Sequence, residues 1–365
     1  MRKRLGEKFN TETRLISNIF ASDATQIHVL AILLAGMMVC LTAFDFSGES
    51  QVLKPRDLDF MFYNVENLFD TLDDPLTNDE EFLPSSEKNW TSQRYQAKLD
   101  SLAKVIQDAL GSRIGIVGLA EIENRRVLED LVNHPTLAFR KLQIVHQESP
   151  DARGIDVALL LPKSVRTDSS YWVNIRFPED TLTKTRDILM TRIYLGKRPV
   201  WVAVNHFPSR RGGEELSRPK RAFVAKRLKQ QVDFWQAVDS SSGFIIMGDF
   251  NDEPMDSSLH LVLGAGPDSS SASLVNLFWE FQQRKLGSYR YKDEWNMLDQ
   301  IIVSRNLIKG NRIQLLEPYA RIYAAGYIRE AEGKYKGNPF RTYAGNRYLG
   351  GFSDHFPVLT TLRYY

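Results

Sequence analysis

Cysteine is nearly absent from this chain, which has one among its 365 residues. That residue, Cys40, lies inside an uncharged segment close to the N-terminus. A single cysteine forms no disulfide within the chain, and everything after it lacks both a thiolate metal ligand and a cysteine nucleophile. Any metal held by that part of the chain must therefore be bound through oxygen or nitrogen atoms.

A surplus of charge of one sign is also missing. The 47 lysine and arginine residues nearly balance the 45 aspartate and glutamate residues, which gives a formal net charge of +2. This balance argues against nonspecific coating of nucleic acid by the whole surface, although it allows a local basic patch. With 43% hydrophobic residues, the composition is that of an ordinary globular protein with one large domain or two small ones. We expect a monomer.

Charge disappears altogether from Val29 to Phe44, which reads VLAILLAGMMVCLTAF, and basic residues precede this run. Its sixteen residues are fewer than the ~20 of a membrane-spanning helix, yet slightly more than a usual signal-peptide core. The basic flank favours a cytoplasmic N-terminus and export of the remainder. The expected division is a basic polar tail at 1–28, a signal peptide or membrane anchor at 29–44, a linker at 45–57 and one folded domain at 58–365.

Within that domain, short apolar runs outnumber the stretches with helical periodicity. Helices are predicted over 93–110, 125–132 and 221–238. Strands are predicted over 58–63, 114–120, 141–146, 155–161, 188–195, 200–204, 244–248, 297–304, 312–316 and 356–362. Because the strands occur in runs with little helix between them, two packed sheets with helices on their outer faces are favoured over one parallel doubly wound sheet.

Polar side chains follow or begin several of these strands. The stretch MGDFNDEP, for example, comes directly after the apolar run 244–246. Such a stretch on its own is typical of a turn. Strand ends at one edge of a sheet lie near one another, however, so the polar groups are expected to converge. The candidates are Asn64, Glu66, Glu121, Asn205, His206, Asp249, Asn251, Asp299, Asp354 and His355.

Carboxylates held close together repel, and a divalent cation with hard oxygen ligands relieves that repulsion. The candidate set is rich in carboxylate and amide oxygens and has only two histidines, His206 and His355. Mg²⁺ is therefore the expected ion, Mn²⁺ is a possible alternative, and Zn²⁺ is disfavoured.

Six motifs in this part of the chain form a recognisable series, with all of them in one order over residues 58–365. The series resembles the endonuclease/exonuclease/phosphatase superfamily, and we interpret it as a deoxyribonuclease-I-like branch of a bacterial secreted type. The motifs are Asn64-Val65-Glu66-Asn67, Leu119-Ala120-Glu121, Asn205-His206, Gly248-Asp249-Phe250-Asn251, Leu298-Asp299-Gln300 and Ser353-Asp354-His355.

The resemblance implies a four-layer α/β/β/α sandwich of two mainly antiparallel sheets flanked by helices. It also implies a metal-dependent phosphoester hydrolase, with 58–365 as the catalytic domain. By similarity, Glu121 is the principal metal ligand, with Asn64, Glu66 and Asp354 beside it.

The same resemblance implies roles in hydrolysis for the remaining motif residues. Asp249 orients or deprotonates the attacking water, and Asn251 holds a phosphate oxygen. His355 contacts the phosphate and stabilises its developing charge, with Asp299 or Asp354 fixing its tautomer. A metal, a base and a cationic donor are what an anionic phosphodiester requires for attack by water.

A basic turn, Pro208-Ser209-Arg210-Arg211-Gly212-Gly213, follows His206. By similarity, His206 occupies the place of a second catalytic histidine. A glycine-rich turn beside it lets guanidinium groups reach a phosphate, so Arg210 and Arg211 are predicted to bind substrate phosphates. Arg153 and Asn205 are predicted to do the same.

These features favour an exported nuclease that cleaves DNA or RNA with a bound divalent metal. A phosphatase or phospholipase, similar to sphingomyelinases or inositol-polyphosphate phosphatases, is the alternative, since members of one superfamily differ mainly in their loops. An inactive binding module is a third class, but it requires losses among the motif residues, and the sequence shows none.

We predict that the protein with residues 1–44 attached is found in the membrane or outside the cytoplasm, because the uncharged run and its basic flank direct export. A chain beginning at residue 45 is expected to be soluble in the cytoplasm. Cell fractionation with immunoblotting of both forms measures this. A full-length protein that is freely soluble in the cytoplasm contradicts the prediction.

Overall fold

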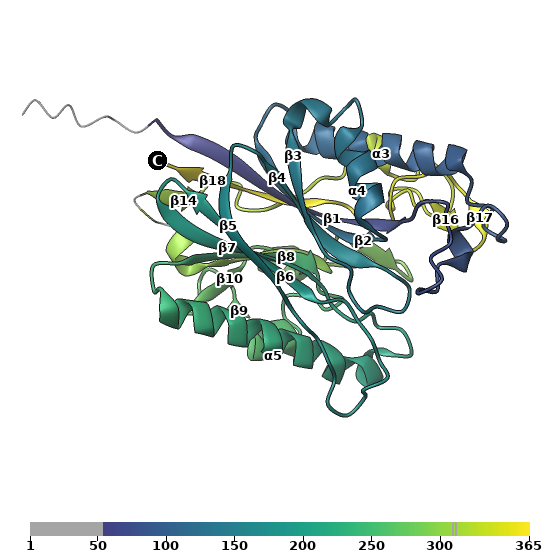
Figure 1. The fold of residues 1–365 in the computed structure, drawn as a ribbon. Helices are drawn as coiled ribbons and strands as arrows, with labels where there is room; N and C mark the ends of the chain where they lie inside the picture. The colour runs from purple at the N-terminus through teal and green to yellow at the C-terminus, as the bar shows by residue number, and fades with distance from the viewer. Residues whose placement is uncertain (1–53, 309, 311) are drawn as a thin grey trace, which may run out of the picture. The chain divides into compact units, whose positions relative to one another are not determined.

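A computed structural model describes residues 54–308, 310 and 312–365 (Figure 1). The N-terminal tail, the uncharged run 29–44 and most of the linker predicted above lie outside these residues. Within them, no helix combines the length and the apolar character needed to cross a membrane.

The first sheet is built around β1 and β2, which are parallel neighbours in an otherwise antiparallel arrangement. β15 (Arg321–Ile322) pairs with β18 at one side. The remaining order is β14 (Ile313–Leu315), β18 (Val358–Tyr364), β1 (Arg56–Leu68), β2 (Gly115–Ile122), β4 (Asp156–Pro162) and β3 (Leu142–His146).

The second sheet repeats this plan around β7 and β8, which are also parallel neighbours. Its remaining pairs are antiparallel except for the short β9 and β10. Its order is β5 (Arg166–Val173), β6 (Ile188–Leu195), β7 (Arg198–His206), β8 (Gly243–Asp249), β13 (Asp299–Ser304), β10 (Leu274–Asn276) and β9 (Ala265–Gly266).

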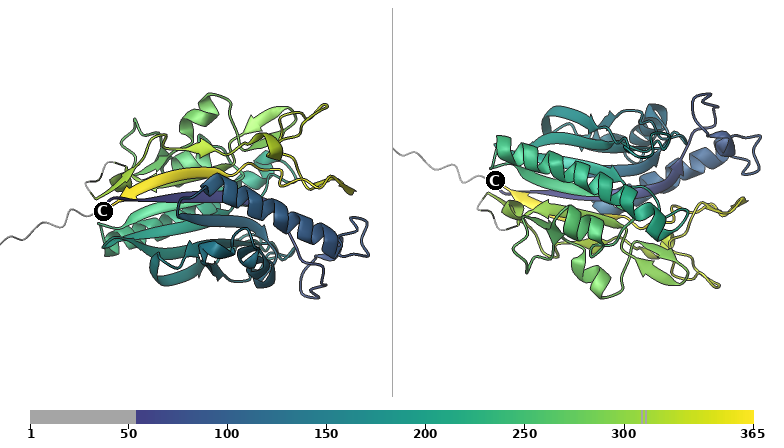
Figure 2. Two further views of the ribbon diagram at one scale, coloured as in Figure 1. Left: turned by 90° about the horizontal axis from the view of Figure 1, so that it is seen from above. Right: turned by 90° about the horizontal axis from the view of Figure 1, so that it is seen from below.

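Helices cover the outer faces of the two sheets. From above, α3 (Ser92–Leu110) lies in front of the sheets, and from below α5 (Glu214–Val238) does (Figure 2). α4 (Arg125–Asn133) lies beside α3 on the outer face of the first sheet. The smaller elements are η1 (Glu80–Phe82), η2 (Ala138–Arg140), the π-helix η3 (Ser258–Val262), α6 (Trp279–Gln283), η4 (Arg305–Leu307), η5 (Gly326–Ile328) and the hairpins β11–β12 (Tyr289–Tyr291, Glu294–Asn296) and β16–β17 (Tyr343–Ala344, Arg347–Tyr348).

Three apolar layers hold these elements together. The central layer joins the two sheets and includes Phe60, Ile116, Val202 and Ile245. A second layer packs α3 and α4 on the first sheet, and a third packs α5 on the second. Complete burial of a large aliphatic or aromatic side chain contributes about 1.5–3 kcal/mol, so these layers supply the main driving force for the four-layer fold.

The connectivity brings the carboxyl ends of two strands to one edge of each sheet. α3 connects β1 to its parallel neighbour β2, and α5 connects β7 to β8 in the same manner. Because each pair is parallel, its two carboxyl ends lie side by side at one edge of its sheet.

The structure confirms the fold class and most of the predicted elements. Two differences have local causes. β5 was missed because RTDSSYWV lacks an apolar alternation, which an edge strand with one polar face does not need. α5 begins seven residues earlier than predicted, at Glu214, because Pro219 lies inside its first turns, and proline normally marks a boundary rather than a helix interior.

Candidate active site

The side chains of Asn64, Glu121 and Asp249 meet where β1, β2 and β8 end. Asn64 Nδ2 donates a hydrogen bond to Asp249 Oδ2 at 3.1 Å and to Glu121 Oε1 at 3.4 Å. The other Glu121 oxygen, Oε2, accepts a hydrogen bond from the Asn67 amide at 3.0 Å. One amide therefore links carboxylates that belong to different sheets.

Two imidazole rings face the same Asp249 oxygen. His206 Nε2 lies 3.7 Å from Asp249 Oδ2, and His355 Nε2 lies 3.9 Å from it. The second oxygen, Oδ1, accepts a hydrogen bond from the Asn251 amide at 2.9 Å. The turn expected after the strand is present, and it fixes the Asp249 carboxylate between the two rings.

The His355 ring is held in place at its Nδ1 atom and by an aromatic neighbour. Its Nδ1 lies 2.6 Å from Asp299 Oδ2, which also accepts a hydrogen bond from the Ser288 hydroxyl. The Tyr289 ring packs against the imidazole with centroids 4.7 Å apart. Of the two carboxylates predicted to fix the His355 tautomer, Asp299 therefore contacts Nδ1, whereas Asp354 Oδ1 lies 3.9 Å from Nε2.

Electrostatics push the pKa values of the two histidines in opposite directions. Burial lowers the pKa of His206 well below its ordinary value, and the positive charges of Arg186 and Arg153 lower it further. Burial alone would also lower the pKa of His355, but the carboxylates around it, Asp299 foremost, raise that pKa well above its ordinary value. Neutral imidazole accepts a proton and imidazolium donates one, so the pair offers both functions at one pH.

Among the carboxylates predicted to bind a metal, the charge of Asp354 acts on both Glu66 and Glu121. Burial, with Asp354 next in effect, raises the pKa of Glu66 to about 7. The same two causes raise the pKa of Glu121. Burial raises the pKa of Asp249 to about 6, and the adjacent Asp299 carboxylate adds to this effect. Buried oxygen donors whose negative charges are incompletely compensated fit a divalent cation. Glu121, Glu66, Asp354 and the amide of Asn64 are the residues that would hold it.

Four of the nine residues other than glycine that have a positive φ in the described part of the chain lie at or beside these positions. Glu66, Asn67, Glu121 and Asn251 have φ values of 53°, 53°, 65° and 49°. The left-handed region costs a residue with a side chain about 1–2 kcal/mol, and such strain persists where the surroundings enforce it, commonly at functional sites. Here the Glu66 amide bonds to Asn64 Oδ1 at 3.0 Å, and the Asn251 amide bonds to Asp249. Local hydrogen bonds therefore keep these residues in conformations that aim their side chains.

Of the residues predicted to bind substrate phosphates, Arg210 is hydrogen-bonded within the protein, whereas Arg211 is exposed. Arg210 is already engaged, since its Nε donates to the Asn251 carbonyl at 2.7 Å and its Nη2 to Asp256 Oδ2 at 3.1 Å. Its contacts position the Asn251 turn rather than leave the guanidinium free for a substrate. Arg211 is exposed, and no carboxylate lies within 4.0 Å of it in the described part of the chain.

The other two phosphate-binding candidates also differ. Arg153 is half-exposed beside Asp151, at 3.5 Å, and its charge acts on the pKa values of both Glu121 and His206. Asn205 is fully buried and donates to the Met247 carbonyl at 3.2 Å, while its Oδ1 has no hydrogen-bond partner among the residues described. A side chain at Gly248 would meet Asn205, with its Cβ 2.4 Å from the Asn205 carbonyl oxygen. The motif glycine is thus required by close packing of β7 on β8.

Sequence reasoning missed three residues of the site. Lys98 on α3 is buried and donates to Thr342 Oγ1 at 2.6 Å and to the Phe352 carbonyl at 2.7 Å. Arg341 lies beside Asp354, with Nη2 3.6 Å from Oδ2, and Tyr289 packs on His355. A signal existed for one of them, because Lys98 falls on the apolar stripe of the predicted helix, four residues before Leu102.

Comparison with known proteins places this arrangement in a family context. Residues 60–364 match the sequence profile of the Endonuclease/Exonuclease/phosphatase family. A search of the curated proteins finds no match.

Solved structures share the fold at low sequence identity. TDP2 of D. rerio, complexed with a single strand DNA product, is 14% identical with a TM-score of 0.52, over 84% of this chain and 98% of that one. An endonuclease/exonuclease/phosphatase family protein from Bacteroides thetaiotaomicron is 13% identical with a TM-score of 0.52, over 86% and 96%. The human Nocturnin catalytic domain with bound sulfate is 15% identical with a TM-score of 0.50, over 85% and 95%.

We predict that Mg²⁺ stabilises the protein more at a pH of about 8 than at about 5. The folded-state pKa values of Glu66 and Asp249, about 7 and about 6, lie above their unfolded values of about 4. Without a cation, the free energy of unfolding therefore falls as the pH rises from about 4 to about 7. Binding of a cation requires the deprotonated carboxylates, so it recovers this loss at high pH.

Thermal melting with and without Mg²⁺ at both pH values measures the effect. At a concentration about 100 times the dissociation constant, the stabilisation is about 2.7 kcal/mol. Glu121→Gln should abolish the Mg²⁺-dependent shift, whereas Glu129→Gln, on the exposed face of α4, should preserve it. An equal shift in the Glu121 variant would contradict the ligand assignment.

Proposed function

Because the chain belongs to the endonuclease/exonuclease/phosphatase family, whose members are hydrolases acting on phosphoester bonds, we propose that it is an exported nuclease. Its substrates are the phosphodiester bonds of DNA or RNA, and its cofactor is a divalent cation, Mg²⁺ or Mn²⁺. The observation that carries the proposal is the convergence of two imidazoles on one buried carboxylate oxygen, at 3.7 and 3.9 Å.

Two imidazoles facing one carboxylate supply the groups that hydrolysis of a phosphodiester needs. Hydrolysis of a phosphodiester needs a base near the attacking water, a proton for the departing alkoxide and positive charge near the phosphate oxygens. Asp249, fixed by Asn64 and the Asn251 amide, orients the water and accepts its proton. His355, kept cationic by Asp299, donates hydrogen bonds to the phosphate. The His355 imidazolium also supplies a proton to the departing alkoxide, and His206, kept neutral by burial and nearby arginines, accepts the proton that Asp249 took from the water.

A divalent cation bound by Glu121, Glu66, Asp354 and Asn64 would offset the negative charge of the phosphate and stabilise the leaving oxygen. The chain's own residues supply the positioning. Glu121 is held by the Asn67 amide and Asn64, and Glu66 Oε2 accepts a hydrogen bond from the Thr342 amide at 2.7 Å. Ligands fixed in this way need little rearrangement when the cation and substrate bind.

A polymeric substrate is supported by exposed or half-exposed cations near the cleft, namely Arg153, Arg211 and Arg341. Guanidinium groups pair well with phosphate oxygens. TDP2 of D. rerio, which shares the fold, was solved with a single strand DNA product. Export rests on the uncharged run 29–44 and its basic flank, which suit an enzyme that digests external nucleic acid.

A substrate panel in Mg²⁺ tests the proposal directly. Plasmid DNA, RNA, bis-p-nitrophenyl phosphate, sphingomyelin and inositol phosphates are incubated with the protein with and without EDTA. We expect cleavage of DNA or RNA that EDTA abolishes and that Mg²⁺ or Mn²⁺ restores. Hydrolysis of sphingomyelin or inositol phosphates without cleavage of nucleic acid would refute the nuclease and favour the lipid or small-molecule alternative.

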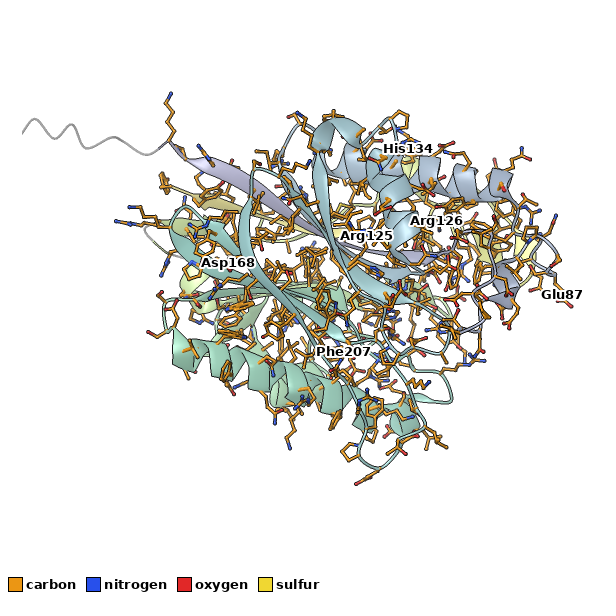
Figure 3. All side chains as sticks on the ribbon, in the orientation of Figure 1. Glu87, Arg125, Arg126, His134, Asp168 and Phe207 are labelled. Atoms are coloured by element: carbon orange, nitrogen blue, oxygen red, sulfur yellow. The ribbon has the colours of Figure 1, made fainter. Side chains whose placement is uncertain are left out.

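We predict that Asp249→Asn and His355→Ala each lower turnover by about two to four orders of magnitude, the usual range for loss of general acid–base catalysis. Each removes a group needed mainly in the transition state, so kcat should fall and KM should change little. Asp168→Asn on β5 and His134→Ala at the end of α4, both labelled in Figure 3 and both outside the motif residues, are controls that should retain full turnover. A raised KM with intact kcat would reassign the altered residue to substrate binding.

A further inference from the structure

A basic hollow lies between α5 and the segment that follows β5. It has a volume of about 460 Å³ and is lined by Asn174, Arg176, Phe223, Lys226, Arg227 and Gln230. Three of these side chains are cationic, two are amides and one is aromatic, and none is acidic. Arg176 and Lys226 are exposed, and Arg227 and Phe223 are partly exposed, so the cations are accessible to a ligand.

The three cations of this hollow form no ion pair within the described residues, although the positive charge of Arg176 opposes the rise that burial causes in the pKa of the nearby Asp187. α5 carries six cations, and four of them have carboxylate partners: Arg218 with Glu215 at 2.8 Å, Lys220 with Asp180 at 2.7 Å, Arg221 with Asp252 at 2.6 Å and Lys229 with Asp233 at 2.5 Å. The other two, Lys226 and Arg227, line the hollow with Arg176. Across the described residues, no carboxylate lies within 4.0 Å of any of these three.

Hydrogen bonds give the hollow a defined shape. Arg227 Nη1 donates to Gln230 Oε1 at 3.0 Å, which orients the guanidinium along the helix. Asn174 Nδ2 donates to Asp187 Oδ2 at 2.6 Å. Phe223 packs on the buried Phe177 with ring centroids 5.5 Å apart. The ring is therefore fixed while part of it stays open to solvent, as a surface for stacking requires.

One side of the hollow, at Asn174, lies at the active-site end of the second sheet, and the other side is the middle of α5. β5 ends at Val173, which pairs with Ile188 at the start of β6, and the next β6 residue, Leu189, pairs with Val204 near the end of β7. Asn174 is therefore two strands from His206, which corresponds to about 10 Å at the usual strand spacing. Phe207, which follows His206, is labelled on the α5 side in Figure 3, and its carbonyl accepts a hydrogen bond from Arg186 at 2.7 Å.

We infer that this hollow, which we call the α5 anion site, binds phosphates of a nucleic-acid strand beyond the one that is cleaved. The inference rests on the nuclease proposed above and specifies where its polymer lies. Guanidinium and ammonium groups attract the backbone phosphates, and Phe223 offers a ring against which a base stacks. A single strand leaving the cleft beside His206 crosses the ends of β7, β6 and β5 to reach this site.

The test compares two charge-matched triple variants. In the first, Arg176→Ala, Lys226→Ala and Arg227→Ala remove the α5 anion site. Alanine is the best helix former, so α5 is expected to fold. In the control, Lys163→Ala, Arg166→Ala and Lys197→Ala remove three cations at the opposite ends of the sheets, after β4, at the start of β5 and in the β6–β7 turn.

Binding of a labelled single-stranded DNA oligonucleotide is measured by fluorescence anisotropy in EDTA over a series of salt concentrations. Each lost phosphate contact on a single strand lowers the slope of log affinity against log salt by about 0.7. The first variant is expected to lower the slope by about 2, and the control is expected to match the wild type. Hydrolysis of bis-p-nitrophenyl phosphate, which is too small to reach the hollow, should be unchanged in both.

Each remaining outcome has a distinct meaning. A wild type that binds and cleaves the oligonucleotide, with a first variant of unchanged slope, overturns the α5 anion site and leaves the nuclease intact. A wild type that hydrolyses bis-p-nitrophenyl phosphate but neither binds nor cleaves nucleic acid refutes the nuclease and this inference with it. Loss of binding to anionic lipid vesicles in the first variant, with oligonucleotide binding unchanged, assigns the hollow to a membrane surface and also overturns the inference.

Discussion

The hydrogen bond from Asn64 to Asp249, at 3.1 Å, is the contact on which the rest of the site depends. The packing between the sheets is apolar and without direction, so it allows small displacements of one sheet on the other. A buried polar bond does not, because its loss would leave a buried carboxylate and a buried amide unpaired. This bond therefore aligns the ends of β1 and β8, and with them the groups that each sheet contributes.

The buried carboxylates of the site destabilise the fold, and nearby cations offset only part of this destabilisation. Several carboxylates share one buried region, and the pKa of Glu66 rises to about 7 as a result. Lys98 and Arg341 supply positive charge from α3 and from the segment before the last strand, and each lowers the pKa of Glu66. The pKa of Glu121 is also raised, first by burial and then by the charge of Asp354. A divalent cation bound here would offset this excess of buried negative charge.

Sequence alone predicted the parts of the fold and the site whose signals are local. The apolar runs gave β6 and the helix α3 nearly to the residue, and polar groups at strand ends marked Asn64, Glu121 and Asp249. Residues that act through distant contacts were missed, since nothing near Arg341 or Tyr289 in the sequence reveals that they approach Asp354 or His355. The contacts of Arg210 were not predicted for the same reason, because its partner Asp256 lies 46 residues away.

A single lysine connects α3 to the last motif of the chain. Lys98 bonds to Thr342 Oγ1 and the Phe352 carbonyl, the Thr342 amide bonds to Glu66, and Phe352 directly precedes Ser353. Ser353 in turn donates to the Asn64 carbonyl at 2.7 Å and accepts from the His355 amide at 3.1 Å. The segment that carries Asp354 and His355 is thus attached on one side to a helix and on the other to β1. Packing of α3 thereby helps to set the position of Asp354 and His355.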